Sequence, residues 1–240
     1  MNVYRKESIG RLLAGNSYPG RGIVAGLTED GSKAAVAYFI MGRSENSRNR
    51  IFKETENGGV VTAPFDASKV QDPSLIIYSA IRWADENTLI VTNGDQTDTI
   101  CEAIQKAKSF EEGLRSRAFE PDAPNFTPRI SLALYFDKAF TYQMSILKSA
   151  DEAGSGCNRF TFDYAPVPGV GHFLHTYAQD GSPIPTFIGE PERILIPNDI
   201  DELTDEIWSN LHEENKISLA VRMIDLTTKD VSSRLINKNK

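Results

Sequence analysis

Short apolar runs of strand length recur along this chain, and only two stretches carry a helical repeat. Strands are expected at residues 23–27, 34–41, 60–63, 75–83, 88–92, 130–136, 140–149, 160–164, 172–177 and 217–226. Helical spacing is confined to 95–108, extending to about 120, and to 199–214. Strands that follow one another with few helices between them predict an α+β fold and not alternating βαβ units. Two antiparallel sheets stacked face to face, with helices outside, would bury this pattern.

The organisation of the chain is simple. No internal repeat, low-complexity tract or linker interrupts the 240 residues, so we expect a single domain over 1–240. The end of the chain is polar, and we expect it to be frayed from about residue 229.

Charge and cysteine content exclude several classes of protein. The formal net charge of -7 disfavours binding to a nucleic-acid polymer, although a small anion in one local pocket stays compatible with it. The two cysteines, Cys101 and Cys157, form neither a disulfide scaffold nor a metal-type pair. The longest apolar run, 34–41, is too short to cross a membrane, and the first residues lack the apolar core of a signal peptide. We therefore expect a reduced, cytoplasmic protein without a membrane partner.

Four arginines stand beside the first two apolar runs. Arg21 lies between two glycines in Y-P-G-R-G, and Arg43, Arg48 and Arg50 follow the second run. Guanidinium groups offer a planar fork of donors that fits phosphate and carboxylate. A local cationic segment with Gly22 in an otherwise acidic chain therefore predicts a phosphate pocket, because glycine also allows close approach of the backbone.

The residues between these arginines support the same prediction. Ser44 and Asn46 are small hydrogen-bonding residues interleaved with the arginines. A solvated surface loop is the plain alternative, but such loops are typically rich in Lys and Glu. Tyr18, just before this segment, is interpreted either as a stacking or hydrogen-bonding contact to a ligand or as a cover for the edge of the core.

A second group of polar residues joins an expected strand to an expected helix. Asn93, Gly94, Asp95 and Asp98 lie in this connection, where a turn with a helix cap is the structural alternative. A helix amino terminus also presents free N–H groups to ligands. Thr127 and Arg129 precede a later strand, and Asp163 lies in a strand before a proline-glycine loop. These three are further candidates, Arg129 for an anion or carbonyl and Asp163 as a proton acceptor.

The histidines do not suggest a metal site. His172 and His175 are three residues apart, and on a strand this spacing directs them to opposite faces. His212 lies in an expected helix without a partner. No P-loop, H-E-x-x-H or G-x-S-x-G motif is present, and we expect neither a metal nor a cofactor.

Six segments together carry a resemblance to a known family. They are Y-P-G-R-G at 18–22, Y-F-I-M-G-R-S-E-N-S-R-N-R at 38–50, T-N-G-D-Q-T-D at 92–98, T-P-R-I at 127–130, F-D-Y-A-P-V-P-G-V-G-H at 162–172 and P-T-F-I-G-E-P at 185–191. In this order they resemble the archaeal-type IMP cyclohydrolases and their bacterial relatives. The last two segments are similar to the bacterial branch in particular.

This resemblance implies a fold and an activity. The fold would be a four-layer αββα sandwich of the Ntn-hydrolase-like type, used without an amino-terminal nucleophile. The activity would be closure of the second ring of 5-formamidoimidazole-4-carboxamide ribonucleotide to inosine monophosphate (IMP), with loss of water. We assign Tyr18, Asn93, Asp98 and Asp163 as catalytic candidates. The substrate-binding candidates are Arg21, Gly22, Arg43, Ser44, Asn46, Arg48, Arg50, Gly94, Asp95, Thr127 and Arg129.

Two other functions stay open at this point. A protein that binds a purine nucleotide without turning it over would need the same arginine pocket. An Ntn-fold hydrolase would need a self-exposed nucleophile, and cleavage before Cys157 would split the chain. The sequence also leaves open whether the chain forms a homo-oligomer.

Overall fold

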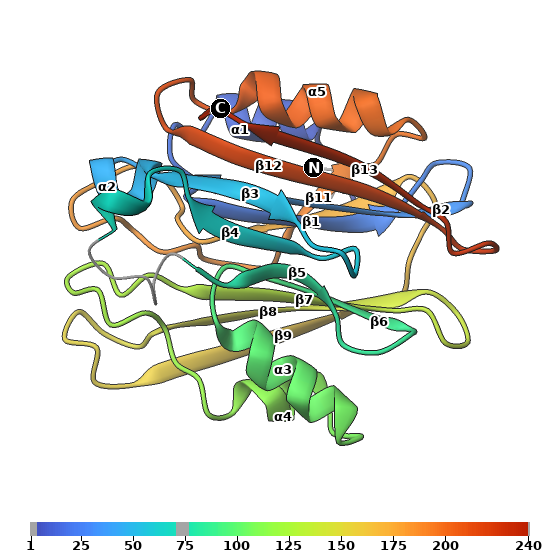
Figure 1. The fold of residues 1–240 in the computed structure, drawn as a ribbon, viewed down its shortest axis with the longest axis horizontal. Coiled ribbons are helices and arrows are strands. Elements are labelled where there is room, and N and C mark those ends of the chain that lie inside the picture. Colours follow the sequence, from blue (N-terminus) through green and yellow to red (C-terminus); the bar gives the residue numbers. More distant parts are fainter. Residues whose placement is uncertain (1–3, 71–76, 240) are drawn as a thin grey trace.

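Two antiparallel sheets lie face to face in the computed structural model, which describes residues 4–70 and 77–239 (Figure 1). The six-stranded sheet has the order β11-β10-β1-β2-β12-β13. Its strands are β1 (Arg21–Leu27), β2 (Lys33–Met41), β10 (Val170–His175), β11 (Glu192–Leu195), β12 (Lys216–Asp225) and β13 (Val231–Asn237). The seven-stranded sheet has the order β3-β4-β5-β6-β7-β8-β9. Its strands are β3 (Arg50–Glu54), β4 (Val60–Pro64), β5 (Ser79–Trp83), β6 (Thr88–Thr92), β7 (Arg129–Tyr135), β8 (Thr141–Ser149) and β9 (Cys157–Tyr164).

Helices cover the outer faces of both sheets (Figure 1). α1 (Ile9–Ala14) and α5 (Ile200–Asn210) pack on the six-stranded sheet, and α3 (Gln96–Gln105) and α4 (Phe110–Leu114) pack on the seven-stranded sheet. The one-turn helix α2 (Glu45–Arg48) and the 3-10 turn η1 (Ala67–Lys69) lie in connections. The predicted α+β fold with two stacked antiparallel sheets is therefore confirmed.

Side-chain alternation along the strands separates the layers of the core. Ile23 and Ala25 of β1 join the cluster between the sheets, whereas Val24 joins the cluster under α1 and α5. The same alternation places Tyr38 of β2 inside and Phe39 outside. Each fully buried side chain of this size contributes roughly 1.5–3 kcal/mol of transfer free energy, so these strands are tightly held in register.

The prediction of a frayed tail from about residue 229 is wrong. Val231–Asn237 form β13, which pairs along its length with β12 from Val231↔Ile224 to Asn237↔Ser218. Leu235 packs toward the inner cluster and Ile236 toward the outer one. Two apolar side chains on opposite faces therefore hold a strand whose other residues, apart from the exposed Val231, are polar.

Several element boundaries also differ from the predictions. The helix expected at 199–214 ends at Asn210, and only Phe110–Leu114 of the region 109–120 is helical beyond α3. α1, α2, β3 and β11 were not predicted. The strand expected at 75–83 begins at Ser79, and its residues 75–76 lie outside the described residues. No helix in the described part of the chain is long and apolar enough to span a membrane.

One end of the sandwich gathers many connections, at the left of Figure 1. β1, β3 and β7 begin there, and β2, β6 and β10 end there. The segments expected to bind a ligand, 18–22, 43–50, 93–98 and 127–129, all adjoin this end.

Candidate functional site

Two arginines are buried at this end of the sandwich. Arg21 begins β1 and Arg50 begins β3, and their exposed fractions are only 8% and 7%. Arg21 shares the inward register of Ile23, and Arg50 shares that of Phe52, so both side chains enter the space between the sheets. Burial lowers the pKa of Arg50, and the charge of Arg21 lowers it further. The two cations therefore act on each other inside the protein.

Among the described residues, the two guanidinium groups have few partners. Within residues 4–70 and 77–239, the side chains of Arg21 and Arg50 donate no hydrogen bond, and Arg50 Nε is buried without a partner. Burial by itself lowers the pKa of Arg21, but the charges of Tyr18, Glu120 and other acidic groups outweigh it and leave the pKa raised. A buried cation without partners is costly, and an anion that fills the site would remove this cost.

A carboxyl group that the sequence analysis missed faces the same cations. Glu120 lies in the connection between α4 and β7, held by its backbone N–H, which donates to Thr127 O at 2.9 Å. Burial raises the pKa of Glu120, and the charges of Arg21 and Arg129 offset only part of the shift. No ion pair joins Glu120 to an arginine among the described residues. Cation and carboxyl are thus within electrostatic reach of each other but not in contact.

Two buried tyrosines complete the inner part of the site. The hydroxyls of Tyr38 and Tyr78 lie 2.7 Å apart and form a hydrogen bond. Burial raises the pKa of both groups, whereas the charges of Arg21 and Arg50 lower it. Both hydroxyls therefore stay protonated at neutral pH and can donate to a ligand or to each other.

An aromatic wall stands beside Arg21. The rings of Tyr18 and Tyr177 stack at 5.8 Å with 17° between their planes, and the Arg43 guanidinium lies 5.1 Å from the Tyr18 ring centre. Thr127 Oγ1 lies 2.5 Å from the Tyr177 hydroxyl. Arg43 also donates to Asp180 Oδ1 at 2.5 Å, so it holds the rim of the site, with its guanidinium partly exposed. A flat ring of a ligand would find a stacking surface here.

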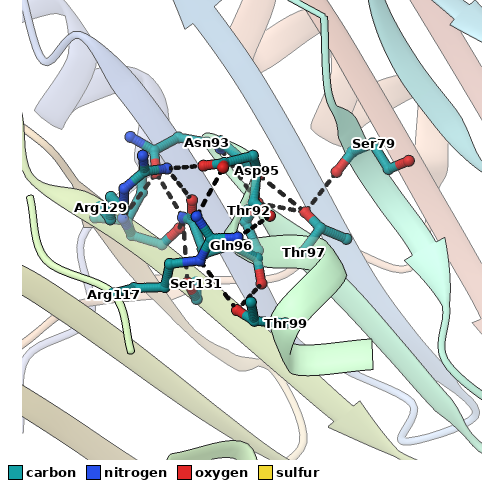
Figure 2. Close-up of polar contacts among 12 residues, drawn as sticks. Ser79, Thr92, Asn93, Asp95, Gln96, Thr97, Thr99, Arg117, Arg129 and Ser131 are labelled. Carbon is teal, nitrogen blue, oxygen red and sulfur yellow. Dashed lines mark hydrogen bonds and ion pairs between the residues drawn. The ribbon is translucent and has the colours of Figure 1, made fainter. Parts of the chain in front are cut away.

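Asp95 connects two arginines at the amino terminus of α3 (Figure 2). Arg129 Nη1 lies 2.7 Å from Asp95 Oδ1, and Arg117 Nη1 lies 2.7 Å from Asp95 Oδ2. Arg129 Nη1 also donates to Gln96 Oε1 at 2.7 Å. This network ties the connection that carries Glu120 to the seven-stranded sheet, so Asp95 and Arg129 act first as structural anchors.

Asn93 and Gly94 have clear structural roles. Asn93 Oδ1 accepts from Ile130 N at 2.9 Å and from Gln96 Nε2 at 3.0 Å, and its Nδ2 donates to Pro128 O at 2.9 Å. An added Cβ at Gly94 would lie 2.4 Å from Arg129 Nη1, so glycine leaves room for the network. The amide of Asn93 is engaged by protein groups and is poorly placed to act on a substrate.

Three predicted residues point away from the buried arginines. Arg48 ends α2, is exposed, and donates to Gly42 O at 3.1 Å and to Asn215 Oδ1 at 3.3 Å. Asp98 lies on α3 in the outer layer and pairs with Arg82 at 2.9 Å. Asp163 is exposed on the edge strand β9, 3.3 Å from Gln143 Nε2. The four early arginines therefore do not converge as a group; Arg21 and Arg50 do.

Gly22, Ser44 and Asn46 also differ from their predicted role. Gly22 faces the outer side of β1, where an added Cβ would lie 2.3 Å from Phe39 Cζ. Ser44 is the N-cap of α2 and accepts from Ser47 N at 3.1 Å, and Asn46 is exposed in the same turn. Gly22 is thus a packing residue, and the segment predicted as a loop is a capped helical turn.

Metal chemistry has no ligand set in the part of the chain that the structure describes, where no group of three or more His, Cys, Asp or Glu is suitably placed. The strongest features of the site are the unpaired cations, the nearby carboxyl and the aromatic wall. Together they suit an anionic ligand with a planar ring.

The sequence analysis missed five residues of this region: Glu120, Tyr38, Tyr78, Tyr177 and Arg117. Only the inward register of Tyr38 with its strand neighbours offered a signal.

Comparison with known proteins agrees with this chemistry. The sequence profile described as IMP cyclohydrolase-like protein matches residues 18–230. A protein named IMP cyclohydrolase from Methanopyrus kandleri is 39% identical over 119 residues, covering 48% of this chain and 57% of its own length. Namesakes from Methanococcus aeolicus and Methanocaldococcus jannaschii are 32% and 33% identical, covering 51% and 49% of this chain and 61% and 56% of their own lengths. The matched region thus spans little more than half the length of these curated relatives. Because the profile matches most of the chain, this protein belongs to the IMP cyclohydrolase-like family.

Proposed function

We propose that this protein closes the ring of 5-formamidoimidazole-4-carboxamide ribonucleotide to form IMP and water. The observation that carries the proposal is the pair of buried arginines, one of them with a buried Nε that has no partner among the described residues, in a chain of the IMP cyclohydrolase-like family. A 5′-phosphate carries two negative charges and several acceptor oxygens near neutral pH. Arg21 and Arg50 would bind this phosphate and so become paired.

The reacting groups of the substrate are neighbours on one ring, so the protein needs to orient them and move protons. The carboxamide nitrogen attacks the formyl carbon, a C–N bond forms, and a proton leaves the nitrogen. Glu120 is the candidate acceptor because its raised pKa makes it a stronger base than an ordinary carboxylate. The protonated Glu120 would then give this proton to the former formyl oxygen. The C–O bond breaks as the formamido N–H gives up its proton to the departing oxygen, so a C=N bond forms and water leaves with both protons.

Other groups of the site support this path. The hydroxyls of Tyr38 and Tyr78 are buried donors that can stabilise negative charge on the formyl oxygen. The stacked rings of Tyr18 and Tyr177 would contact the imidazole ring of the substrate. Holding both reacting groups in one rotamer supplies several kcal/mol of the barrier reduction in related intramolecular reactions.

The direct test is to mix the protein with the formamido ribonucleotide and follow the purine absorbance. Ring closure should appear with the unmodified protein and be at least about 100-fold slower with Glu120→Gln, the size typical of a lost general base. Tight IMP binding with no turnover by the unmodified protein would favour a nucleotide-binding module in place of the enzyme. An Arg48→Met variant serves as a control and should close the ring at the unmodified rate. Arg48 lies in the same segment as Arg50, but its side chain points away from the site.

The finer features of the fold are part of the same proposal. We propose that the helix-sheet-sheet-helix arrangement is of the Ntn-hydrolase-like type, and that the chain is a single domain. Neither a metal nor a cofactor is needed for the steps above. Cytoplasmic location stays a prediction, and whether the chain forms a homo-oligomer stays open.

A further inference from the structure

β9 (Cys157–Tyr164) forms one edge of the seven-stranded sheet (Figure 1). Within residues 4–70 and 77–239 its strand partner is β8 alone, and residues 158–161 are all exposed. β9 contains no proline, and its register with β8 shows no bulge. Prolines, bulges and covering segments are the devices that commonly keep an edge strand from pairing with another chain. β9 is therefore open to a further strand.

The other edges of the two sheets are less suited to a further strand. Backbone hydrogen bonds of Glu7 cover the edge of β11, and the side chain of Asn237 bonds both backbone groups of Phe52 in β3. β13 carries Arg234 as its one charged side chain, and this arginine pairs with Asp201 of α5. β9 is thus the edge that combines an uncovered backbone with charges of both signs.

The odd-numbered residues of β9 direct their backbone groups to the open edge. Ala150 N donates to Gly156 O at 2.9 Å, so this pair is hydrogen-bonded, and the register continues from it without a shift along β8 and β9. Hydrogen-bonded pairs alternate along an antiparallel ladder, so the even-numbered residues of β9 bond to β8. The N–H and C=O groups of Arg159, Thr161 and Asp163 therefore face outward, where a partner strand can bond to them.

One register of self-pairing places opposite charges together. About a two-fold axis at Thr161, Arg159 of each copy lies opposite Asp163 of the other, and side chains directly opposite lie on one face. Moving the axis by two residues would place Arg159 opposite Arg159, or Asp163 opposite Asp163. Moving it by one residue would leave both charges without an opposite charge across the axis. Charge therefore selects the register centred on Thr161.

Both charged side chains have capacity for this contact. Arg159 donates to three backbone carbonyls at 2.5–3.4 Å, and Asp163 accepts from Gln143 Nε2 at 3.3 Å. Among the described residues, neither of the two forms an ion pair with another side chain. A carboxylate has room for several donors, and a guanidinium offers five N–H groups.

The same register gives partners to the aromatic face of β9. Phe160 is 43% exposed, with Lys148 Nζ 5.4 Å from its ring centre, and Phe162 is partly buried against the inner core. Phe160 of each copy would lie opposite Phe162 of the other, in a non-hydrogen-bonded pair, where side chains come closest. Aromatic pairs across strands stabilise a sheet, so an exposed ring becomes covered on association.

We propose that β9 is a dimer interface, where a second copy of this chain adds its own β9 antiparallel about a two-fold axis at Thr161. The seven-stranded sheets of the two copies then form one continuous sheet. Such an interface is isologous, because the same strand serves both copies. The inference is independent of the proposed function, since it depends on the edge strand and not on the buried arginines.

The first experiment measures the oligomeric state of the whole chain. Analytical ultracentrifugation at up to about 100 µM should give twice the mass of one 26.6 kDa chain. Thr161→Pro removes an N–H that bonds to the partner and should give a folded monomer, because proline is tolerated on an edge strand at such a position. Thr161→Ala keeps this N–H and should stay dimeric. A monomeric unmodified protein, or a dimer in Thr161→Pro, would overturn the inference.

The second experiment exchanges charges and tests the register. Arg159→Asp alone and Asp163→Arg alone each place like charges opposite each other twice, so each should raise the dissociation constant of the dimer at least about 10-fold. An equimolar mixture of these two variants should dimerise again, because every charge in the mixed dimer faces its opposite. Glu86→Arg, in the exposed turn between β5 and β6, changes the net charge as Asp163→Arg does and should leave the dimer unchanged. A mixture that dimerises no better than its components would overturn the inference.

Discussion

Replacing Arg50 with methionine should weaken ligand binding and at the same time stabilise the free protein. Arg50 is buried, its Nε has no partner, and burial together with the charge of Arg21 lowers its pKa. The fold therefore bears an electrostatic cost that methionine, of similar length and apolar, would remove. A buried donor left unsatisfied costs roughly 1–3 kcal/mol, so the free energy of unfolding should rise by about that amount.

Binding should change in the opposite direction. Hydrogen bonds between a guanidinium and a phosphate contribute about 1.5–3 kcal/mol each, and Arg50 can offer one or two of them. A loss of about 2–4 kcal/mol of binding free energy corresponds to a dissociation constant that is roughly 30- to 1000-fold higher. Calorimetric titration with IMP and with inorganic phosphate gives this value, and urea unfolding of the free protein gives the stability.

The matched control is Arg48→Met. Arg48 lies two residues before Arg50 but is exposed and donates to Gly42 O and Asn215 Oδ1. Its replacement should leave the affinity for IMP within about twofold, since surface contacts of this kind contribute little. If Arg50→Met binds IMP as tightly as the unmodified protein, or if Arg48→Met weakens binding equally, the assignment of the phosphate site is refuted.

Three further changes test other parts of the structure. Burial raises the pKa of Glu120 above its usual value near 4.5, so its ionised carboxyl destabilises the fold. In the unmodified protein, the free energy of unfolding measured in urea should therefore rise as the pH falls through that raised pKa, and Glu120→Gln should lack this rise. Gly22→Ala should cost about 1–3 kcal/mol in thermal or urea unfolding, because its Cβ would lie 2.3 Å from Phe39 Cζ, whereas Gly156→Ala, which makes only ordinary contacts, should cost little. His172 has its pKa lowered from 6.5 to about 4, so its contribution to stability should be lost as the pH falls from about 6.5 to about 4, and His172→Phe should lack this decline, which is up to about 3 kcal/mol.

Continuous apolar runs of strand length explain why much of the fold was predictable from the sequence. β1 and β2 are apolar and buried on both faces, and the strands there were placed within a few residues of their observed bounds. The alternation of side-chain direction along β1 puts Arg21 inward with Ile23 and Gly22 outward, a consequence not used when both were assigned to one pocket. Neighbours in a strand lie on opposite faces, so adjacent residues seldom share a site.

The segment 43–50 shows a second limit. Arg48 and Arg50 are two residues apart, and in a single strand they would face the same way. The capped turn α2 ends at Arg48 and β3 begins at Arg50, so a change of backbone conformation between them directs the two side chains apart. A sequence read as one loop could not reveal which arginine enters the core.

Glu120 could not be found from the sequence because its role depends on distant parts of the chain. It stands in an irregular proline-rich connection without any period, ninety-nine residues after Arg21 by the numbering. Only the stacking of the two sheets, with β1 in one and β7 in the other, brings the start of β7 and its preceding connection near Arg21. Contacts between sheets carry no local signature.

The separation of opposite charges in this site is itself informative about the ligand. Glu120 would gain by contacting Arg21, yet the described residues form no such ion pair. Backbone hydrogen bonds hold each residue in place, Glu120 N to Thr127 O and Arg21 N to Thr176 Oγ1. A ligand with an anionic group at one end and an ionisable N–H at the other would satisfy both residues at once. A simple anion such as phosphate would satisfy only the arginines, so the formamido ribonucleotide should bind more tightly and stabilise the protein more than phosphate does at the same free ligand concentration.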